Sequence, residues 1–191
     1  MKNRVLLFGL LFISGFIYGQ EYLKPVNTAR FGINRAFFGS GDITGPGIYG
    51  ELSFALNDFF AVTPRIMSAF AYRNSEGYFQ NASSFSTSIS VRITPLPDLF
   101  RRLKFDFGGL YHKFINTYGK IEEMTDYDEY YSNNTTHYKE ELFGLIGSMN
   151  VNIIDSKKIE TGLRFDMLTS FTEGYFNCDS WQTGIYIGLK F

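Results

Sequence analysis

The sequence predicts an all-β fold in which eight antiparallel strands, connected up-and-down, close into a barrel. Three observations lead to this prediction. Long stretches alternate apolar and polar side chains with the period of two that a strand imposes. Aromatic residues make up 18% of the chain, with 21 Phe and 13 Tyr, although only 45% of the chain is hydrophobic. The last eleven residues, 181–191, form one such alternating stretch, and the final residue is itself aromatic.

The terminal stretch sets the pattern for the others. One face of the strand is almost entirely apolar and carries Trp181, Thr183, Ile185, Ile187, Leu189 and Phe191. The opposite face carries Gln182, Gly184, Tyr186, Gly188 and Lys190. An apolar face that runs to the last residue, with no polar tail to cover it, suits a surface that faces lipid rather than water.

The same alternation predicts seven further strands. The eight expected strands are residues 28–38, 47–56, 59–72, 84–94, 103–115, 138–153, 158–171 and 181–191. The longer expected connections are 39–46, 73–82, 116–136 and 172–180, and the short ones are 57–58 and 154–157. Bacterial barrels place short turns on the periplasmic side and longer loops outside. This pattern therefore predicts that both termini lie in the periplasm.

The polar faces predict a wet interior. Ser84, Ser86, Ser88 and Ser90 form a row on one face of the fourth strand, which is difficult to place in a dry core. A soluble barrel of the lipocalin type, with its apolar face inside, is the alternative architecture. It would need an outer face rich in Lys and Glu, whereas the polar positions here are mostly Gly, Ser, Thr, Ala and Asn.

Charged residues on the expected inward faces are nearly balanced in sign. They are Glu51, Arg65, Arg92, Lys104, Asp106, Glu160, Arg164 and Asp166. We expect them to form a network of ion pairs that fills the lumen, because buried charges are costly unless they are paired. The alternative is a narrow pore in which the same charges select the solute. An eight-stranded barrel leaves little room for water, and this favours the filled lumen.

Aromatic residues on the apolar faces fall at two levels when both termini are placed in the periplasm. We expect an aromatic girdle at each membrane interface. The inner girdle consists of Phe60, Phe105 and Phe191. The outer girdle consists of Phe70, Tyr72, Phe85, Phe171 and Trp181.

The first 20 residues have the features of a secretory signal peptide. Lys2 and Arg4 precede an apolar stretch, 5–18, that is too short to span a bilayer as a helix. Residues 21–191 then form a single barrel domain. Without the two signal-peptide cations, 16 basic residues face 19 acidic ones. Such a balance argues against a nucleic-acid partner.

Few residues suggest catalysis or metal binding, and we expect no cofactor, no metal and no catalytic residue. Cys178 is the only cysteine, so no intramolecular disulfide can form. The histidines are His112, expected inside the barrel, and His137, which has hydroxyl residues near it in a predicted loop. The acidic, tyrosine-rich stretch 122–131 lacks the spacing of a calcium loop. A solvated loop that contacts other molecules through its tyrosines fits it better.

Taken together, the signal peptide, the alternating strands over 28–191, the unequal connections and the ending Gly184-Ile-Tyr-Ile-Gly-Leu-Lys-Phe191 resemble the small bacterial outer-membrane barrels of the OmpA/OmpX and OmpW-like porin group. The resemblance implies that barrel-assembly machinery and periplasmic chaperones handle the chain. It also implies that Gly184, Tyr186, Leu189 and Phe191 belong to an assembly signal. Outer-membrane lipids and lipopolysaccharide are further expected partners, along with an extracellular ligand that the sequence does not identify.

Three functions are compatible with this architecture. We expect a structural and surface-interaction protein that acts through its extracellular loops. A small porin for small solutes is the first alternative, and a lipid A-modifying enzyme, such as a deacylase-like hydrolase, is the second. The chain ends at Phe191 without the periplasmic peptidoglycan-binding domain of OmpA, so a cell-wall tether is not expected.

Overall fold

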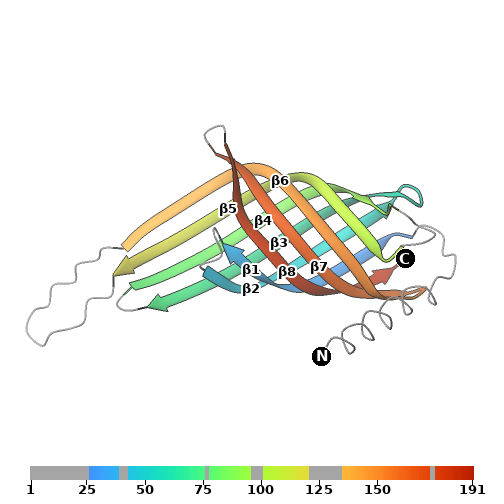
Figure 1. The fold of residues 1–191 in the computed structure, drawn as a ribbon, viewed down its shortest axis with the longest axis horizontal. Helices are drawn as coiled ribbons and strands as arrows, with labels where there is room; N and C mark the ends of the chain where they lie inside the picture. The colour runs from blue at the N-terminus through green and yellow to red at the C-terminus, as the bar shows by residue number, and fades with distance from the viewer. Residues whose placement is uncertain (1–25, 39–42, 76–77, 96–100, 121–134, 173–174) are drawn as a thin grey trace, which may run out of the picture.

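The computed structural model describes residues 26–38, 43–75, 78–95, 101–120, 135–172 and 175–191. These residues form a closed barrel of eight antiparallel strands in sequence order (Figure 1). The strands are β1 Thr28–Phe38, β2 Ile43–Ala55, β3 Phe60–Ser75, β4 Tyr78–Ile93, β5 Leu103–Lys120, β6 Thr135–Asp155, β7 Ile159–Thr172 and β8 Tyr175–Lys190. The predicted fold class is confirmed. The expected signal peptide, 1–20, lies outside the described residues.

The barrel closes between its first and last strands. β1 pairs with β8 along its whole length, from Thr28 opposite Lys190 to Phe38 opposite Ser180. The strands are tilted, as barrel closure requires. The tilt is visible when directly paired residues are followed from strand to strand around the barrel. This path starts near the short-turn end of β2 and finishes at the far end of β1. It runs through Phe54, Val62, Val91, Phe107, Gly147, Met167, Trp181 and Phe37.

The barrel is polar inside and apolar outside. Along β1, Arg30 and Asn34 are buried, whereas Phe31 and Ile33 on the opposite face are each 54% exposed. The same alternation holds on the other strands, so most of the large exposed side chains are apolar and many buried ones are polar or charged. The soluble lipocalin-type alternative is therefore wrong, because its interior would be apolar.

The exposed apolar band has the height of a membrane core. On β3 it runs from Phe60 to Phe70, both exposed. Eleven residues of a strand tilted by roughly 40° rise about 25 Å, which matches the apolar band of outer-membrane barrels. Among the described residues, no helix is long and apolar enough to cross a membrane.

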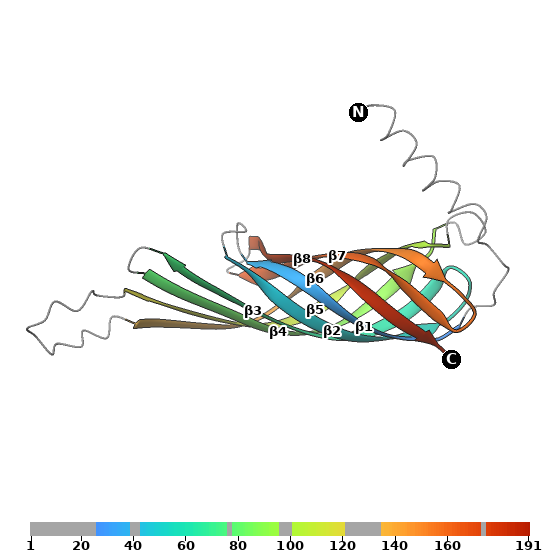
Figure 2. The same cartoon turned by 90° about the horizontal axis from the view of Figure 1, so that it is seen from below.

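Four strands continue beyond this band and form a projecting sheet. β3 pairs with β4 up to Ser75 and Tyr78, and β4 pairs with β5 up to Tyr78 and Lys120. β5 pairs with β6 up to Gly119 and Thr135. The ribbon shows β3–β6 extending away from the barrel, while the β7–β8 hairpin bends in another direction (Figures 1 and 2).

The structure corrects several expected loops. The segments 73–82 and 172–180 are largely strand, and β2 begins at Ile43, inside the expected loop 39–46. β5 continues to Lys120 and β6 starts at Thr135. The strands were predicted too short at the end away from the short turns, because both faces of a sheet are wet once it leaves the membrane. The apolar–polar alternation then fades although pairing continues.

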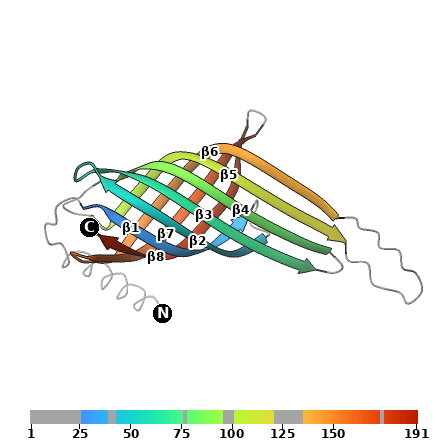
Figure 3. The same cartoon turned by 180° about the vertical axis from the view of Figure 1, so that it is seen from behind.

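The opposite end of the barrel carries the short β2–β3 and β6–β7 turns and the C-terminus (Figure 3). In the β2–β3 turn, the Asn57 side chain accepts hydrogen bonds from the backbone N–H groups of Phe59 and Phe60, at 2.9 and 2.8 Å. This local bond stabilises the turn and explains the choice of Asn at its start.

Candidate functional site in the lumen and the projecting sheet

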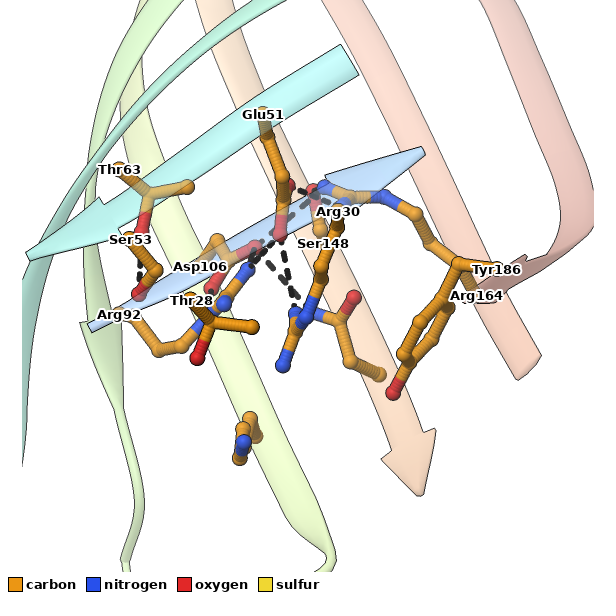
Figure 4. Close-up of polar contacts among 12 residues, drawn as sticks. Thr28, Arg30, Glu51, Ser53, Thr63, Arg92, Asp106, Ser148, Arg164 and Tyr186 are labelled. Atoms are coloured by element: carbon orange, nitrogen blue, oxygen red, sulfur yellow. Dashed lines mark hydrogen bonds and ion pairs between the residues drawn. The ribbon is translucent and has the colours of Figure 1, made fainter. Parts of the chain in front are cut away.

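Glu51 is the first centre of a charged network inside the barrel. Its carboxylate accepts from Arg92 and Arg164, each at 2.6 Å, from Arg65 at 2.9 Å and from Arg30 at 3.0 Å. Figure 4 shows dashed contacts from several arginines converging on this carboxylate. Each charge-assisted bond compensates part of the cost of removing these groups from water.

Asp106 is the second centre. It accepts from Arg92 at 2.7 Å, from Arg65 at 2.9 Å and from Arg164 at 3.3 Å. The Asn150 amide adds a bond at 3.1 Å. Because three arginines contact both Glu51 and Asp106, the two carboxylates and their partners form one connected cluster rather than separate pairs.

Glu160 and Asp166 complete the network from β7. Glu160 accepts from Arg30, from Lys104 at 3.1 Å and from Asn152 at 2.9 Å. Asp166 accepts from Arg164 at 2.7 Å and from Arg65 at 3.2 Å. The structure thus brings together all eight charged residues singled out in the sequence.

Arg30 belongs to the same network and was not among the eight. It contacts Glu51 and Glu160, and its guanidinium lies 4.7 Å from the centre of the Tyr186 ring. Arg30 shares one face of β1 with Gly32 and Asn34, opposite the apolar residues Phe31 and Ile33. This pattern could have identified Arg30 as inward-facing. With Arg30 included, five cations face four carboxylates.

A layer of apolar side chains covers the charged network on its outer side. Tyr49, Met67, Leu110, Ile146 and Leu168 belong to one cluster of buried residues. Along their strands they lie two to four residues farther from the short-turn end than Glu51, Arg65, Asp106, Ser148 and Asp166 respectively. Such a layer excludes water above the ion pairs, so the described lumen is filled rather than open.

Two glycines make room for the large lumen tyrosines. A Cβ on Gly32 would lie 2.3 Å from Tyr49 Cε1, and one on Gly162 would lie 2.6 Å from the Tyr186 hydroxyl. The Tyr186 hydroxyl donates to the side chain of Asn152. The aromatic rings therefore cover backbone on the neighbouring strands and fill the lumen from β2 and β8.

His112 also points into the lumen, where it meets Ser86. The Ser86 Oγ and His112 Nδ1 atoms are 2.7 Å apart, and His112 is fully buried. Sequence reasoning missed this pair because the residues are 26 positions apart and meet only through β4–β5 register. The pair lies on the lumen side of the barrel wall. It is therefore separated from the acyl and phosphate groups on which lipid-modifying enzymes act.

The residues expected in the aromatic girdles lie on the outer face. Phe60, Phe70, Tyr72, Phe85 and Phe171 are between 43% and 54% exposed. Phe105 and Trp181 are half-buried by neighbours. The Trp181 ring stacks on Phe37 across the β1–β8 closure, with centroids 3.8 Å apart.

The residues of the expected assembly signal divide between the two faces of β8. Tyr186 is buried in the lumen, whereas Leu189 and Phe191 are about 60% exposed on the outside. Gly184 lies against β1: a Cβ there would approach the Ile33 carbonyl oxygen to 2.2 Å. The Phe191 N–H donates to Asn27 O at 3.0 Å, which extends the closure to the last residue.

The projecting sheet has two free edges, on β6 and on β3, whose pairing with β2 ends at Ala69. β6 pairs with β7 only from Gly144 onward, so residues 135–143 have β5 as their one neighbour among the described strands. Tyr118 and Tyr138, on the lumen-side face of this sheet, are each nearly half exposed. Gln80 and Asn116 on the same face share an amide hydrogen bond of 3.2 Å. The acidic stretch 122–131 lies outside the described residues.

No group of three or more potential metal ligands is found in the part of the chain that the structure describes. The site is therefore defined by three features: an interior filled with ion pairs, an apolar outer wall and a sheet that continues past the wall. These features define a β-barrel of the membrane-spanning type.

Solved structures share this fold. The Ail protein of Yersinia pestis superposes with a TM-score of 0.59 at 6% identity, over 88% of this chain and 100% of that one. OprG of Pseudomonas aeruginosa gives 0.54 at 11% identity, over 88% and 97%. Neisserial surface protein A gives 0.53 at 11% identity, over 86% and 96%. No family model and no curated protein sequence matches the chain. The chain thus has the fold of small bacterial outer-membrane barrels.

Proposed function

We propose that this protein is an integral outer-membrane barrel that presents the projecting β3–β6 sheet at the cell surface, where it binds other molecules. The observation that carries this proposal is the continuation of four paired strands beyond the apolar band, with the outer edges of β3 and β6 unpaired. An unpaired edge offers backbone N–H and C=O groups to an added strand, and exposed tyrosines add rigid contact area.

The membrane position follows from the physical chemistry of the wall. In a closed barrel, every backbone N–H and C=O group of the sheet can form a hydrogen bond with a neighbouring strand. The apolar outer face can then contact lipid instead of water. The projecting sheet is then extracellular, and the short-turn end, with both chain termini, is periplasmic. Assembly would require periplasmic chaperones and the barrel-assembly machinery, with the β8 residues Gly184, Tyr186, Leu189 and Phe191 as the recognised signal.

The lumen supports a structural role in preference to transport. Nine charged side chains and an apolar layer fill the section through which a solute would pass. A porin would need a continuous wet path, and an enzyme acting on lipid A would need a nucleophile accessible from the membrane. The Ser86–His112 pair is buried inside the barrel and faces away from lipid.

One neighbour suggests a class of ligand to try first. Ail has been solved in complex with the heparin analogue sucrose octasulfate. Heparin and other sulfated polysaccharides are therefore suitable immobilised probes for cells that display this protein.

The proposal is tested by shortening the sheet. In the first variant, Asn-Gly replaces residues 117–137 between the cross-strand partners Asn116 and Tyr138. In the second, the same turn replaces only 120–134, between the partners Gly119 and Thr135. We expect cells with the full protein to bind at least one probe, the second variant to keep most of this binding, and the first to fall to the level of cells without the protein. Equal binding by the first variant and the full protein would contradict the proposal.

A further inference from the structure

Two lysines and a glutamate form a compact patch on the outer wall of the β5–β6 hairpin. Lys113 Nζ lies 3.5 Å from Glu141 Oε1, and Lys139 Nζ lies 3.2 Å from the same oxygen. The Tyr111 hydroxyl donates to Glu141 Oε2 at 3.0 Å. Both carboxylate oxygens are thus occupied, and the patch keeps a net charge of +1.

The geometry places the two ammonium groups side by side. Because both contact one oxygen atom, they cannot be farther apart than the sum of those two distances. Each ammonium has three donors and uses one on Glu141. The Lys113 and Lys139 side chains are 37% and 57% exposed, so their remaining donors face outward. A phosphate group, with several acceptor oxygens, can bridge two ammonium groups over such a span.

The patch lies immediately beyond the apolar band. Tyr111 pairs with Phe143, whose side chain is 72% exposed, and Lys113 pairs with Phe85 on the other side. Leu145 continues the apolar surface toward the membrane centre. Acyl chains can therefore lie along Phe143 and Leu145 while a headgroup of the same lipid reaches the lysines.

A separate cation lies on the outer face of β1. Arg35 is exposed on the outer face between apolar neighbours and donates to Thr44 Oγ1 at 2.9 Å, on the side away from the membrane centre. A guanidinium that turns outward in this way is typical of a cation within the apolar band that reaches toward the headgroup region.

We propose that Lys113 and Lys139, held in place by Glu141, bind a phosphate group of a lipid in the outer leaflet of the outer membrane. The proposal rests on the membrane position put forward above. A lipid fits better than a soluble anion because the lysines face sideways from the barrel, directly above lipid-contacting side chains, rather than upward into the medium. Cationic side chains at a membrane surface favour anionic headgroups in this way.

The test uses the full protein purified in detergent and native mass spectrometry with added lipid A. The probes are lipid A that carries its phosphates and the same lipid A with the phosphates removed. The variant is Lys113→Gln with Lys139→Gln. The matched control is Lys157→Gln with Lys158→Gln, which removes the same charge at the short-turn end of the barrel.

We expect the wild type and the control to retain phosphorylated lipid A, and the Lys113/Lys139 variant to bind it about 30-fold more weakly. The dephosphorylated lipid should bind all three proteins equally weakly. Inorganic phosphate at the concentration of the lipid should not displace phosphorylated lipid A from the wild type.

Equal retention by the variant and the wild type would overturn the proposal, as would displacement by inorganic phosphate or equal binding of both lipids to the wild type. Cell fractionation separates this failure from that of the proposed function. If the wild type and variant are heat-modifiable and found in the outer membrane but bind lipid A alike, only the phosphate site is wrong. If the wild type is absent from the outer membrane, the proposed function itself is wrong.

Discussion

At the level of single residues, the lumen depends on carboxylates that several arginines share. Glu51 contacts four arginines, and its side chain is fully buried. Removing one partner from a buried ion network leaves uncompensated charge in a region from which water is excluded, and this costs more than the net contribution of the intact pairs.

We therefore expect Glu51→Gln to destabilise the folded barrel by about 3–5 kcal/mol, because four guanidinium groups lose their shared countercharge. Glu141→Gln is the control, since that carboxylate is half exposed and its loss should cost less than about 1 kcal/mol. Urea unfolding in lipid vesicles measures both. Equal destabilisation by the two substitutions would show that the lumen network does not stabilise the barrel.

Two adjacent glycines offer a test of close packing between strands. A Cβ on Gly108 would lie 2.1 Å from the Ile89 carbonyl oxygen, whereas one on Gly109 would have nothing within 4 Å. We expect Gly108→Ala to cost roughly 1–3 kcal/mol. Gly109→Ala should be neutral or stabilising, because alanine loses less backbone entropy than glycine. The same unfolding assay compares them, and the reverse order would contradict the predicted strand faces.

At the level of elements, β8 combines three roles that its sequence only partly revealed. Its inner face supplies Tyr186 and Gln182 to the lumen, and its outer face supplies Trp181 and Leu189. Its backbone closes the barrel against β1 up to the last residue. Closure leaves no free edge within the membrane, where unpaired backbone groups would be costly.

Deletion of Phe191 should reduce assembly of the barrel in the outer membrane, because the closing strand and its proposed recognition signal both end at this residue. Phe143→Ala is the matched control: it removes another exposed aromatic, at the opposite rim and far from the closure. The amount of heat-modifiable protein in outer-membrane fractions measures assembly. A normal amount of the truncated protein would show that Phe191 is not part of a signal.

The elements also show what sequence reasoning could and could not predict. The bounds of β1, 28–38, were predicted correctly, because its alternation lies wholly within the membrane. The outer ends of β3, β4, β5 and β6 were missed, because polar residues such as Asn74 and His137 occupy strand positions that are exposed to water.

Within the site, alternation was enough to predict that Arg65 and Asp106 point inward. The sharing of Glu51 by four arginines could not be predicted, since it depends on how a closed barrel brings β1, β3, β4 and β7 around one carboxylate. The Ser86–His112 contact depends on register in the same way.

At the level of the whole molecule, the barrel is layered along its axis. Ion pairs fill the section near the short turns, and the cluster around Leu110 and Ile146 covers them. A second buried apolar cluster, formed by Ala36, Phe38, Ile43, Ala69, Ala71 and Ala82, lies farther toward the projecting sheet. This succession separates the lumen charges from the outside.

The layered lumen predicts that the protein does not conduct ions. Purified protein inserted in planar bilayers should show no current steps above the leak of the lipid, because neither a water column nor a chain of exposed charges crosses the barrel. A porin known to be active serves as the positive control. Reproducible steps from the wild-type protein would favour the pore over the filled lumen.

The central claim is that this barrel lies in the outer membrane with the β3–β6 sheet outside and the short turns inside. The most direct measurement is antibody binding to intact cells that carry a short epitope at one of two positions: between Asp126 and Tyr127, in the β5–β6 connection, or between Lys157 and Lys158, in the β6–β7 turn. We expect labelling of intact cells only for the first position, and labelling of both once the outer membrane is permeabilised. Labelling of the second position on intact cells, or of neither position before permeabilisation, would contradict it.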